Sequence, residues 1–421
     1  MKKITAVLVG AGGRGHFAYA PYAKAYPHEL EFVAVAEPIR TRRESFAEQY
    51  GIPPEGRYES WEHVFEKPRL ADVMIICTQD RMHYEPAIRA LAHGYHVLLE
   101  KPMSNDPKEC IEMAEAAKRY DRLLTICHVL RYTPFWSAIK TWIEDGKIGD
   151  VVSIQLNENV GFYHMAHSFV RGNWRNAEQS SPMILAKSCH DMDLLAWLVG
   201  KECVRVSSFG SLMHFHEKQA PAGSTERCTD GCAAEPTCPY SAMRIYLRDY
   251  RDWARFITDD LSNEGIVEAL NTGPYGRCVY RCDNNVVDHQ VVNLEFAGGA
   301  TASFTMCGFT HDCSRSVQVM GTKGEIRGYM TDAKVTLYDF ATGEQTELRF
   351  NTGADDHGGG DERIMRRFLH EVRHYAKGSR SLTSAEESVQ SHLMAFAAEQ
   401  SRLNGGTSID LADYRRRVLG G

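Results

Sequence analysis

Two features are missing from this chain of 421 residues: a long apolar run and a long basic run. No segment approaches the roughly 18 apolar residues that a membrane-spanning helix needs. The formal net charge is −7 and the pI is near 6.2, which argues against nucleic acid or an anionic membrane surface as the partner. Internal repeats and low-complexity tracts are also absent. We therefore expect the chain to act on a small molecule.

Signals for secretion are weak as well. The apolar run at residues 6–9 is too short for a signal peptide and breaks into glycines. The 12 cysteines are spread through the chain, and Cys77 and Cys127 fall in predicted strands, which favours reduced thiols over a disulfide framework. We expect a cytoplasmic protein with two packed cores.

A glycine-rich turn follows the first predicted strand, residues 4–9, and precedes a predicted helix, residues 16–25. The pattern Gly-x-Gly-x-x-Gly suits a tight turn, close approach of the backbone to a pyrophosphate, and close packing of helix on strand. The candidate cofactor-binding residues here are Gly10, Gly12, Gly13, Arg14 and Gly15.

The second predicted strand, residues 31–36, ends at Glu37, where an acidic residue is expected to bind the adenosine ribose. Its carboxylate would repel a 2′-phosphate, which favours NAD over NADP. Arg40, Arg42 and Arg43 follow closely and keep NADP open as the alternative.

Further predicted strands, at residues 72–77, 95–99 and 123–127, alternate with predicted helices. This alternation predicts an α/β fold with a doubly wound parallel sheet. Polar residues stand just after two of these strands, where open α/β sheets bind ligands: Thr78, Gln79 and His83 follow one, and Glu100, Lys101 and Pro102 follow another.

With these motifs, the sequence resembles the Gfo/Idh/MocA family of NAD(P)-dependent oxidoreductases. Later segments around Arg131, Trp174, Arg175 and His190 extend the resemblance through most of the chain. It implies a Rossmann domain, residues 1–128, followed by an α+β domain, residues 129–421, built on an open, mostly antiparallel sheet. Predicted C-terminal helices span about 362–404, and a homo-oligomer, a dimer or a tetramer, is expected.

The resemblance also implies roles for particular residues. Lys101 would contact both cofactor and substrate, and His190 would be catalytic, with Asp193 on the same helix face. Where the family often has an aspartate, this chain has Ala186, and Lys187 beside it could bind a substrate hydroxyl or anion. Arg131, Trp174 and Arg175 are assigned to binding the cofactor or positioning the substrate, and further substrate-binding candidates are Asp288, His289 and His357.

Three cysteines, Cys228, Cys232 and Cys238, lie close together in a loop rich in glycine and proline. Their spacing is compatible with a structural zinc site, whereas unmetallated thiols and a disulfide are the alternatives. The fourth zinc ligand would have to come from elsewhere, and the candidates are His214, His216, Cys278 and Cys282.

Together these features predict an NAD-dependent oxidoreductase that takes a hydride from a secondary hydroxyl of a sugar, glycoside or cyclitol. Lys101 suits the role of base, because burial and a nearby cation both disfavour its ammonium form. The main alternative is a redox-cycling glycoside hydrolase, which oxidises C3 transiently, eliminates the C1 substituent, adds water and reduces the ketone again. A non-catalytic NAD-binding sensor is the third possibility.

Overall fold

The computed structural model describes residues 3–351 and 357–420. Its first sheet has six strands in the order β3-β2-β1-β4-β5-β6, and every neighbouring pair is parallel. The strands are β1 (Ile4–Val9), β2 (Leu30–Ala36), β3 (Arg57–Tyr58), β4 (Val73–Ile76), β5 (His96–Leu99) and β6 (Leu124–Ile126). The strand order reverses between β1 and β4, so the crevice at their carboxyl ends is the expected place for a ligand.

Both faces of this sheet are buried. Its strands are nearly continuous apolar runs, which is typical of a parallel sheet that is covered on both sides. Leu8, Ile75 and Leu98 pack into the core on one face, and their neighbours Val7, Met74 and Val97 pack into the core on the other. The covering helices include α1 (Pro21–Ala25), α2 (Arg40–Tyr50), α3 (Trp61–Val64), α4 (Tyr84–Ala92) and α5 (Pro107–Tyr120).

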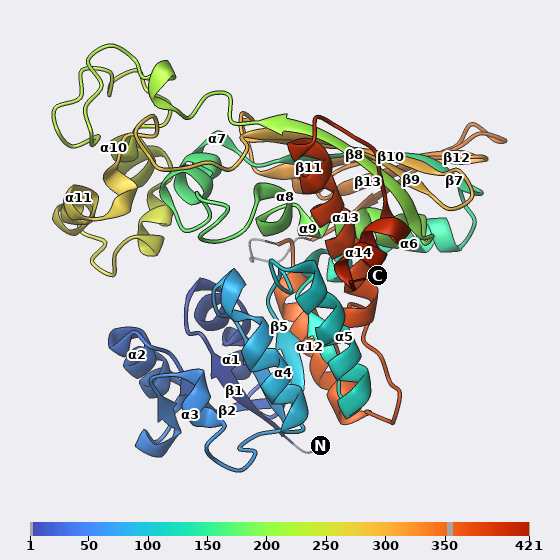
Figure 1. The fold of residues 1–421 in the computed structure, drawn as a ribbon, viewed down its shortest axis with the longest axis horizontal. Coiled ribbons are helices and arrows are strands. Elements are labelled where there is room, and N and C mark those ends of the chain that lie inside the picture. The colour runs from blue at the N-terminus through green and yellow to red at the C-terminus, as the bar shows by residue number, and fades with distance from the viewer. Residues whose placement is uncertain (1–2, 352–356, 421) are drawn as a thin grey trace.

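Helix α12 (Gly360–Arg373) comes from the end of the chain but packs on the first sheet (Figure 1). Its apolar side chains Ile364, Met365, Phe368 and Leu369 are fully buried in the same core as Leu8. The C-terminal part of the sequence therefore helps to build the half of the molecule that contains the first sheet.

The second sheet has nine strands in the order β14-β13-β12-β11-β7-β10-β9-β8-β15. All neighbouring pairs are antiparallel except β7 and β10, which are parallel. The strands are β7 (Val151–Asn159), β8 (Cys203–Ser211), β9 (His289–Phe296), β10 (Thr301–Cys307), β11 (Ser314–Gly321), β12 (Gly324–Tyr329), β13 (Lys334–Asp339), β14 (Gln345–Arg349) and β15 (Ile409–Asp410). These two sheets confirm the predicted fold class.

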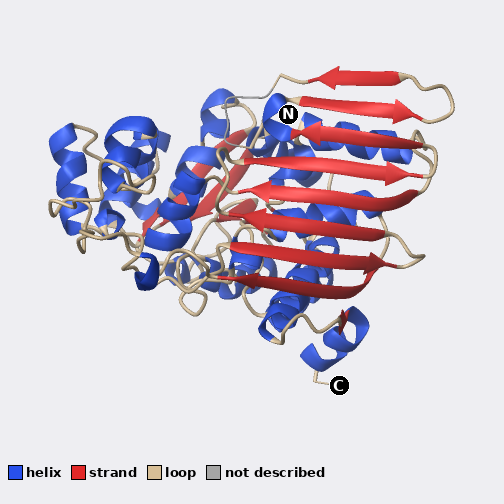
Figure 2. Cartoon of the chain, turned by 90° about the horizontal axis from the view of Figure 1, so that it is seen from above, coloured by secondary structure: helices blue, strands red, loops and turns tan. Residues whose placement is uncertain are grey.

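Helices cover only one face of the second sheet (Figure 2). Helices α6 (Pro134–Glu144), α9 (Cys189–Val199) and α13 (Ala385–Leu403) contact its strands, and α14 (Leu411–Val418) ends the chain. Buried and exposed residues alternate along β9 and β10. On the uncovered face, Phe209 pairs with Val291 across two strands, and both side chains are exposed.

Short helices between β7 and β9 form a lobe beside the sheet (Figure 1). They are α7 (Phe162–His164), the π-helical η5 (Met165–Arg171), α10 (Ala242–Arg244), η7 (Ile245–Asp249), η8 (Arg251–Phe256) and α11 (Asn263–Thr272). Helix α8 (Met183–Ala186) instead lies under the second sheet and contacts α9 and α13. Strand β8 ends at Ser211, where the chain enters this lobe.

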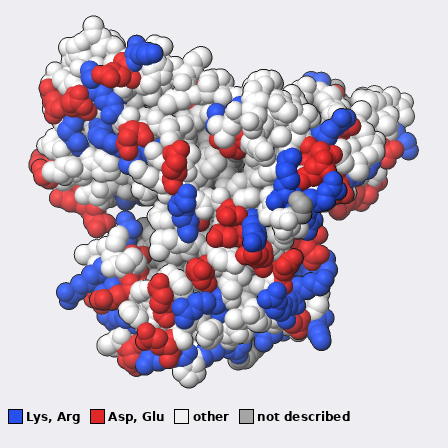
Figure 3. Space-filling model, viewed as in Figure 1, with Lys and Arg blue, Asp and Glu red and all other residues white. Residues whose placement is uncertain are grey.

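Acidic and basic side chains intermingle on the molecular face drawn in Figure 3. None of the helices within residues 3–351 and 357–420 is both long enough and apolar enough to cross a membrane.

Candidate active site between the two sheets

The glycine turn after β1 has the shape that a pyrophosphate site requires. Gly10 has φ +90°, and a Cβ there would lie 2.5 Å from the carbonyl oxygen of Cys77, while a Cβ on Gly15 would lie 2.2 Å from that of Gly10. Both positions therefore need glycine. A Cβ on Gly12 or Gly13 would meet no other atom within 4 Å. The turn thus leaves open space beside its backbone, which fits a dinucleotide phosphate.

Glu37 ties the end of β2 to this turn. Its buried carboxylate accepts hydrogen bonds from the backbone N–H groups of Ala11, at 2.8 Å, and Ile39, at 3.0 Å. The nearby Arg43 donates to the Glu37 carbonyl oxygen at 2.7 Å and pairs with Glu59 at 3.3 Å. One of the three arginines that could accept a 2′-phosphate is therefore already engaged.

Arg14 belongs to a buried polar network under the turn. Its guanidinium contacts Glu100 at 2.7 Å and Asp361 at 2.6 Å, and Tyr19 donates to the same Glu100 oxygen at 2.5 Å. Burial raises the pKa of Glu100, but Arg14 and Lys101 outweigh this effect and leave it below its usual value. The network fixes the strand end that carries Lys101, because the other Glu100 oxygen accepts the Lys101 N–H at 2.9 Å.

The residues after β4 also brace the crevice. His83 is buried, with Nδ1 2.6 Å from the carbonyl oxygen of Pro102 and Nε2 3.1 Å from that of Thr78, so it links the ends of β4 and β5. The Lys101–Pro102 peptide bond is cis. Gln79 lines a cavity of about 270 Å³ together with Arg175 and other polar residues of both halves.

Lys101 reaches from the first half of the molecule to the second. Its Nζ donates to the carbonyl oxygen of Ala186, at the end of α8, at 2.7 Å. His190 lies in the first turn of α9 and is buried. Burial lowers the pKa of His190 well below its usual value, and the positive charge of Lys101 adds to the effect. The imidazole of His190 is therefore held in its neutral form close to the Lys101 side chain.

Other histidines surround this pair. The ring of His190 lies 5.8 Å from that of His128 and 6.0 Å from that of His357, and His128 lies 5.6 Å from His392. Burial lowers the pKa of His128 well below its usual value, and Arg131 lowers it further. We did not predict a role for His128. Its position just after β6, at the carboxyl end of a parallel strand, could have identified it as a candidate site residue.

Asp193 contacts Arg131 rather than His190. Two hydrogen bonds of 2.7 Å join its carboxylate to the guanidinium, and both side chains are buried. Burial raises the pKa of Asp193 despite the opposing charge of Arg131. The pair joins α9 to the 3-10 turn after β6.

Lys187 belongs to a buried charged network on the second sheet. Its Nζ lies 3.2 Å from Glu158 and 3.9 Å from the Cys313 sulfur, and Arg315 bridges Glu158, at 2.5 Å, to Asp191, at 2.7 Å. Burial lowers the pKa of Lys187, but Cys313 and Glu158 outweigh this and leave it raised. Lys187 is thus a cation held next to the histidine cluster.

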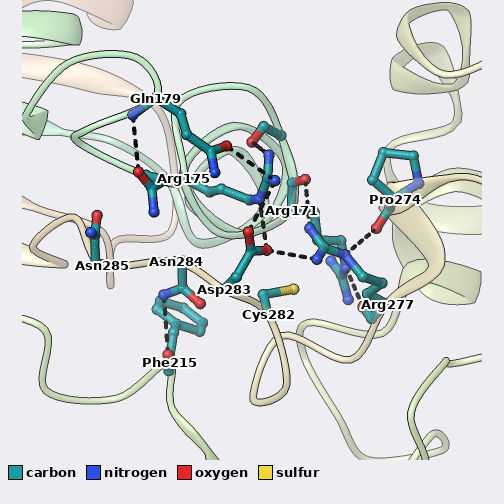
Figure 4. A network of polar contacts seen from close by, with 12 residues as sticks. Arg171, Arg175, Gln179, Phe215, Pro274, Arg277, Cys282, Asp283, Asn284 and Asn285 are labelled. Atoms are coloured by element: carbon teal, nitrogen blue, oxygen red, sulfur yellow. Dashed lines mark hydrogen bonds and ion pairs between the residues drawn. The ribbon is translucent and has the colours of Figure 1, made fainter.

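Several other predicted site residues have structural contacts. Trp174 Nε1 donates to both Asp80 oxygens at 3.2 Å, which joins the two halves, and Arg175 pairs with Asp283 at 2.8 Å (Figure 4). The buried Asp288 accepts from the backbone of His214 at 2.8 Å and lies 2.8 Å from His289 Nδ1. His357 lies 3.1 Å from Asp361 at the start of α12.

The predicted zinc site is not supported. Cys228, Cys232 and Cys238 line one small cavity, and all three are free thiols. In the part of the chain that the structure describes, no group of three or more His, Cys, Asp or Glu side chains is arranged to hold a metal ion.

Comparisons with known proteins agree with this architecture. A model described as "Oxidoreductase family, NAD-binding Rossmann fold" matches residues 4–128, and one described as "Oxidoreductase family, C-terminal alpha/beta domain" matches residues 140–411. The putative oxidoreductase YteT of Bacillus subtilis (strain 168) is 27% identical over 311 residues, which cover 70% of this chain and 71% of that protein.

Two further relatives carry more specific names. The D-glucoside 3-dehydrogenase of Escherichia coli (strain K12) is 26% identical over 150 residues, which cover 34% of this chain and only 40% of that protein. The structure of a levoglucosan dehydrogenase in complex with NADH and levoglucosan has a TM-score of 0.71 at 18% identity and covers 97% of this chain and 99% of its own. At this identity the structural likeness shows the fold alone. The two family models span most of the sequence, and the chain belongs to the Gfo/Idh/MocA family of oxidoreductases.

Proposed function

We propose that this protein is an NAD-dependent dehydrogenase that oxidises a secondary hydroxyl of a sugar, glycoside or cyclitol. The observation that carries the proposal is the contact of Lys101, at the carboxyl end of β5, with Ala186 of the opposite half, beside the buried His190. Lys101 links the two halves of the molecule next to a neutral imidazole. This position suits a residue that transfers protons better than it suits a lysine that only carries charge at the surface.

The glycine turn and Glu37 would hold the cofactor. Gly12 and Gly13 offer the open backbone that a pyrophosphate needs, and Glu37, at the end of β2, suits the ribose hydroxyls. NAD is favoured over NADP because a carboxylate there repels a 2′-phosphate and Arg43 already pairs with Glu59. The nicotinamide, when bound, supplies the hydride acceptor that the oxidation requires.

Lys101 would take the hydroxyl proton, and His190 would share or relay it. His190 is suited to accept a proton because burial keeps its pKa well below the usual value, so that it is neutral near pH 7. The amine of Lys101 must itself be unprotonated to act as base.

The surroundings of Lys101 suit a substrate with several hydroxyl groups. Lys187, His164 and His357 are polar side chains in electrostatic contact within the same cluster. The lysine can donate hydrogen bonds, and a neutral histidine can both donate and accept them. One relative by sequence, a D-glucoside 3-dehydrogenase, is named for a sugar substrate. This similarity supports a carbohydrate for the present chain.

A redox-cycling glycoside hydrolase is the second candidate. After C3 is oxidised, a base would remove the proton at C2, the C1 substituent would leave, water would add, and the ketone would be reduced again. The specific observation in its favour is the number of neutral histidines near Lys101, since His128, His164 and His190 all have a pKa held low by burial. A simple dehydrogenase needs fewer bases.

One incubation separates the two candidates. The purified protein is mixed with NAD and a panel of free sugars, glycosides and cyclitols, and NADH absorbance and product NMR are followed together. NADH that accumulates with a keto product supports the dehydrogenase. Release of the aglycone at constant absorbance, still dependent on NAD, supports the hydrolase, and no turnover on any substrate would contradict both.

A further inference from the structure

His128 is a buried histidine at the carboxyl end of β6, near both His190 and Asp193. Its side chain is completely buried, yet neither ring nitrogen has a hydrogen-bond partner within residues 3–351 and 357–420. The ring centre lies 5.8 Å from that of His190, and Nε2 lies 3.7 Å from Asp193 Oδ1. A buried polar group without a partner is costly, and in a native protein it often has a functional reason.

His190 has the same deficiency on one side of its ring. Its Nδ1 atom is buried and has no hydrogen-bond partner in the described part of the chain, while the residue as a whole keeps an exposed fraction of 5%. Nε2 is therefore the ring nitrogen that is available to a substrate. Lys101 and Arg315 both act on His190 electrostatically, but neither can accept a hydrogen bond, because ammonium and guanidinium groups are donors only.

The third histidine of this buried group, His392, cannot supply the missing partner. Its ring centre lies 5.6 Å from that of His128, but both of its nitrogens are engaged with the backbone. Nδ1 lies 2.8 Å from the carbonyl oxygen of Ser388, and Nε2 accepts from the Met103 N–H at 2.9 Å. The unpaired nitrogens of His128 and His190 are therefore left for each other.

The neighbours of His128 determine which of its nitrogens carries the hydrogen. Burial and the charge of Arg131 lower the pKa of His128 well below its usual value, so the ring is neutral and carries one hydrogen. Nε2 faces Asp193, whose carboxylate accepts two hydrogen bonds from Arg131. An accepting oxygen favours the hydrogen on Nε2. Nδ1 of His128 is then an acceptor, and it requires a donor.

We propose that His128 is a positioning residue that fixes the tautomer of His190, by accepting a hydrogen bond from His190 Nδ1–H at its own Nδ1. Facing nitrogens at hydrogen-bond distance bring two ring centres slightly closer than 5.8 Å, so a small ring rotation completes the contact.

The fixed tautomer has a consequence for catalysis. With the hydrogen of His190 on Nδ1, its Nε2 is an acceptor on the side of the crevice. The proton that Lys101 removes from the substrate hydroxyl can then pass to His190 Nε2, which returns Lys101 to its basic form. This consequence rests on the proposed function, whereas the tautomer itself does not.

The direct test is nitrogen NMR of the isotope-labelled histidine side chains in the whole chain, with the His190 signals assigned by their loss in His190→Gln. We expect the hydrogen on Nδ1 of His190 in the unmodified chain, and on Nε2 in His128→Leu, which removes the acceptor. A hydrogen on Nε2 in the unmodified chain would overturn the proposal without any variant at position 128 and without a substrate. An unchanged tautomer in His128→Leu would also overturn it, and would point to His357, whose ring lies 6.0 Å from His190.

Rate measurements separate positioning from packing. His128→Leu and His128→Asn both lose the imidazole, but His128→Asn keeps an oxygen acceptor near the place of Nδ1. On a substrate that is oxidised, we expect His128→Leu to lower kcat by about 10²-fold at unchanged KM, because a base contributes at least that much, and His128→Asn to keep most of the rate. Equal rates in the two variants would refute the role of the acceptor.

His96 provides a matched control at the amino end of β5, the opposite end of the strand from Lys101. Its Nδ1 accepts from the Leu123 N–H at 3.1 Å, so His96→Leu also removes a histidine acceptor. We expect this variant to keep the kcat of the unmodified protein and the tautomer of His190. If no substrate is oxidised, the proposed function fails, whereas the NMR result still decides the present proposal.

Discussion

The Asp193→Asn substitution removes the charge from a buried ion pair and keeps the size of the side chain. Arg131 would retain the carbonyl oxygen of Leu382, at 3.2 Å, the ring of Trp197, 5.4 Å away, and the one amide oxygen left at position 193, but it would lose its anionic partner. Breaking a buried pair in this way typically costs about 3–5 kcal/mol. With a shift of about 2–4 °C per kcal/mol for a domain of this size, we expect the thermal midpoint to fall by roughly 6–20 °C.

The assay is thermal unfolding followed by circular dichroism, with Glu295→Gln as the control. Glu295 pairs with Arg205 at the surface, where the two side chains are 37% and 59% exposed, so its loss should cost about 1 kcal/mol or less. A destabilised Asp193→Asn variant with unchanged KM below its transition would support a structural role. Equal midpoints for both variants, or a raised KM without loss of stability, would refute the reasoning.

Three further predictions concern cofactor binding, acid stability and assembly. Glu37→Gln should weaken NAD binding about 10- to 100-fold by calorimetry, because charged hydrogen bonds contribute about 1.5–3 kcal/mol; unchanged affinity would contradict this. Burial lowers the pKa of His392 and His167 to about 3. In the unfolded chain these two histidines bind protons at a higher pH than in the folded chain, so the free energy of unfolding should fall as the pH drops below about 6.5. Urea titrations with equal midpoints at pH 7 and pH 5 would contradict this prediction. Phe209→Glu places a charge on the uncovered sheet face and should reduce the size of the oligomer measured by light scattering. If the unmodified protein is already a monomer, the prediction that this face mediates assembly is wrong.

Short-range patterns predicted the first half of the chain well. The glycines at 10 and 15 are required by contacts with the backbone of Cys77 and Gly10, and such constraints appear directly as Gly in the sequence. Apolar runs on both sides of Lys101 predicted a buried strand end because parallel strands are covered on both faces.

Long-range contacts could not be predicted in this way. Spacing along the helix placed Asp193 beside His190, but the partner that satisfies it is Arg131, 62 residues earlier. Strand β14 has no buried residue, so no apolar alternation marked it. The short helices of the lobe lack the length at which a helical period is visible, and the approach of Cys278 to Cys228 depends on a backbone pairing across this lobe.

The central claim is that Lys101 transfers the proton in an NAD-dependent oxidation. The most direct measurement compares the initial rate of NADH formation for the unmodified protein, Lys101→Ala and Lys118→Ala, on whichever panel substrate is oxidised, with NAD affinity measured separately. Lys118 is an exposed lysine of α5 and serves as the control. We expect Lys101→Ala to lower kcat by about 10²–10⁴-fold while NAD still binds. Lys118→Ala should keep the kcat of the unmodified protein. A Lys101→Ala variant that keeps the rate of the unmodified protein would contradict it.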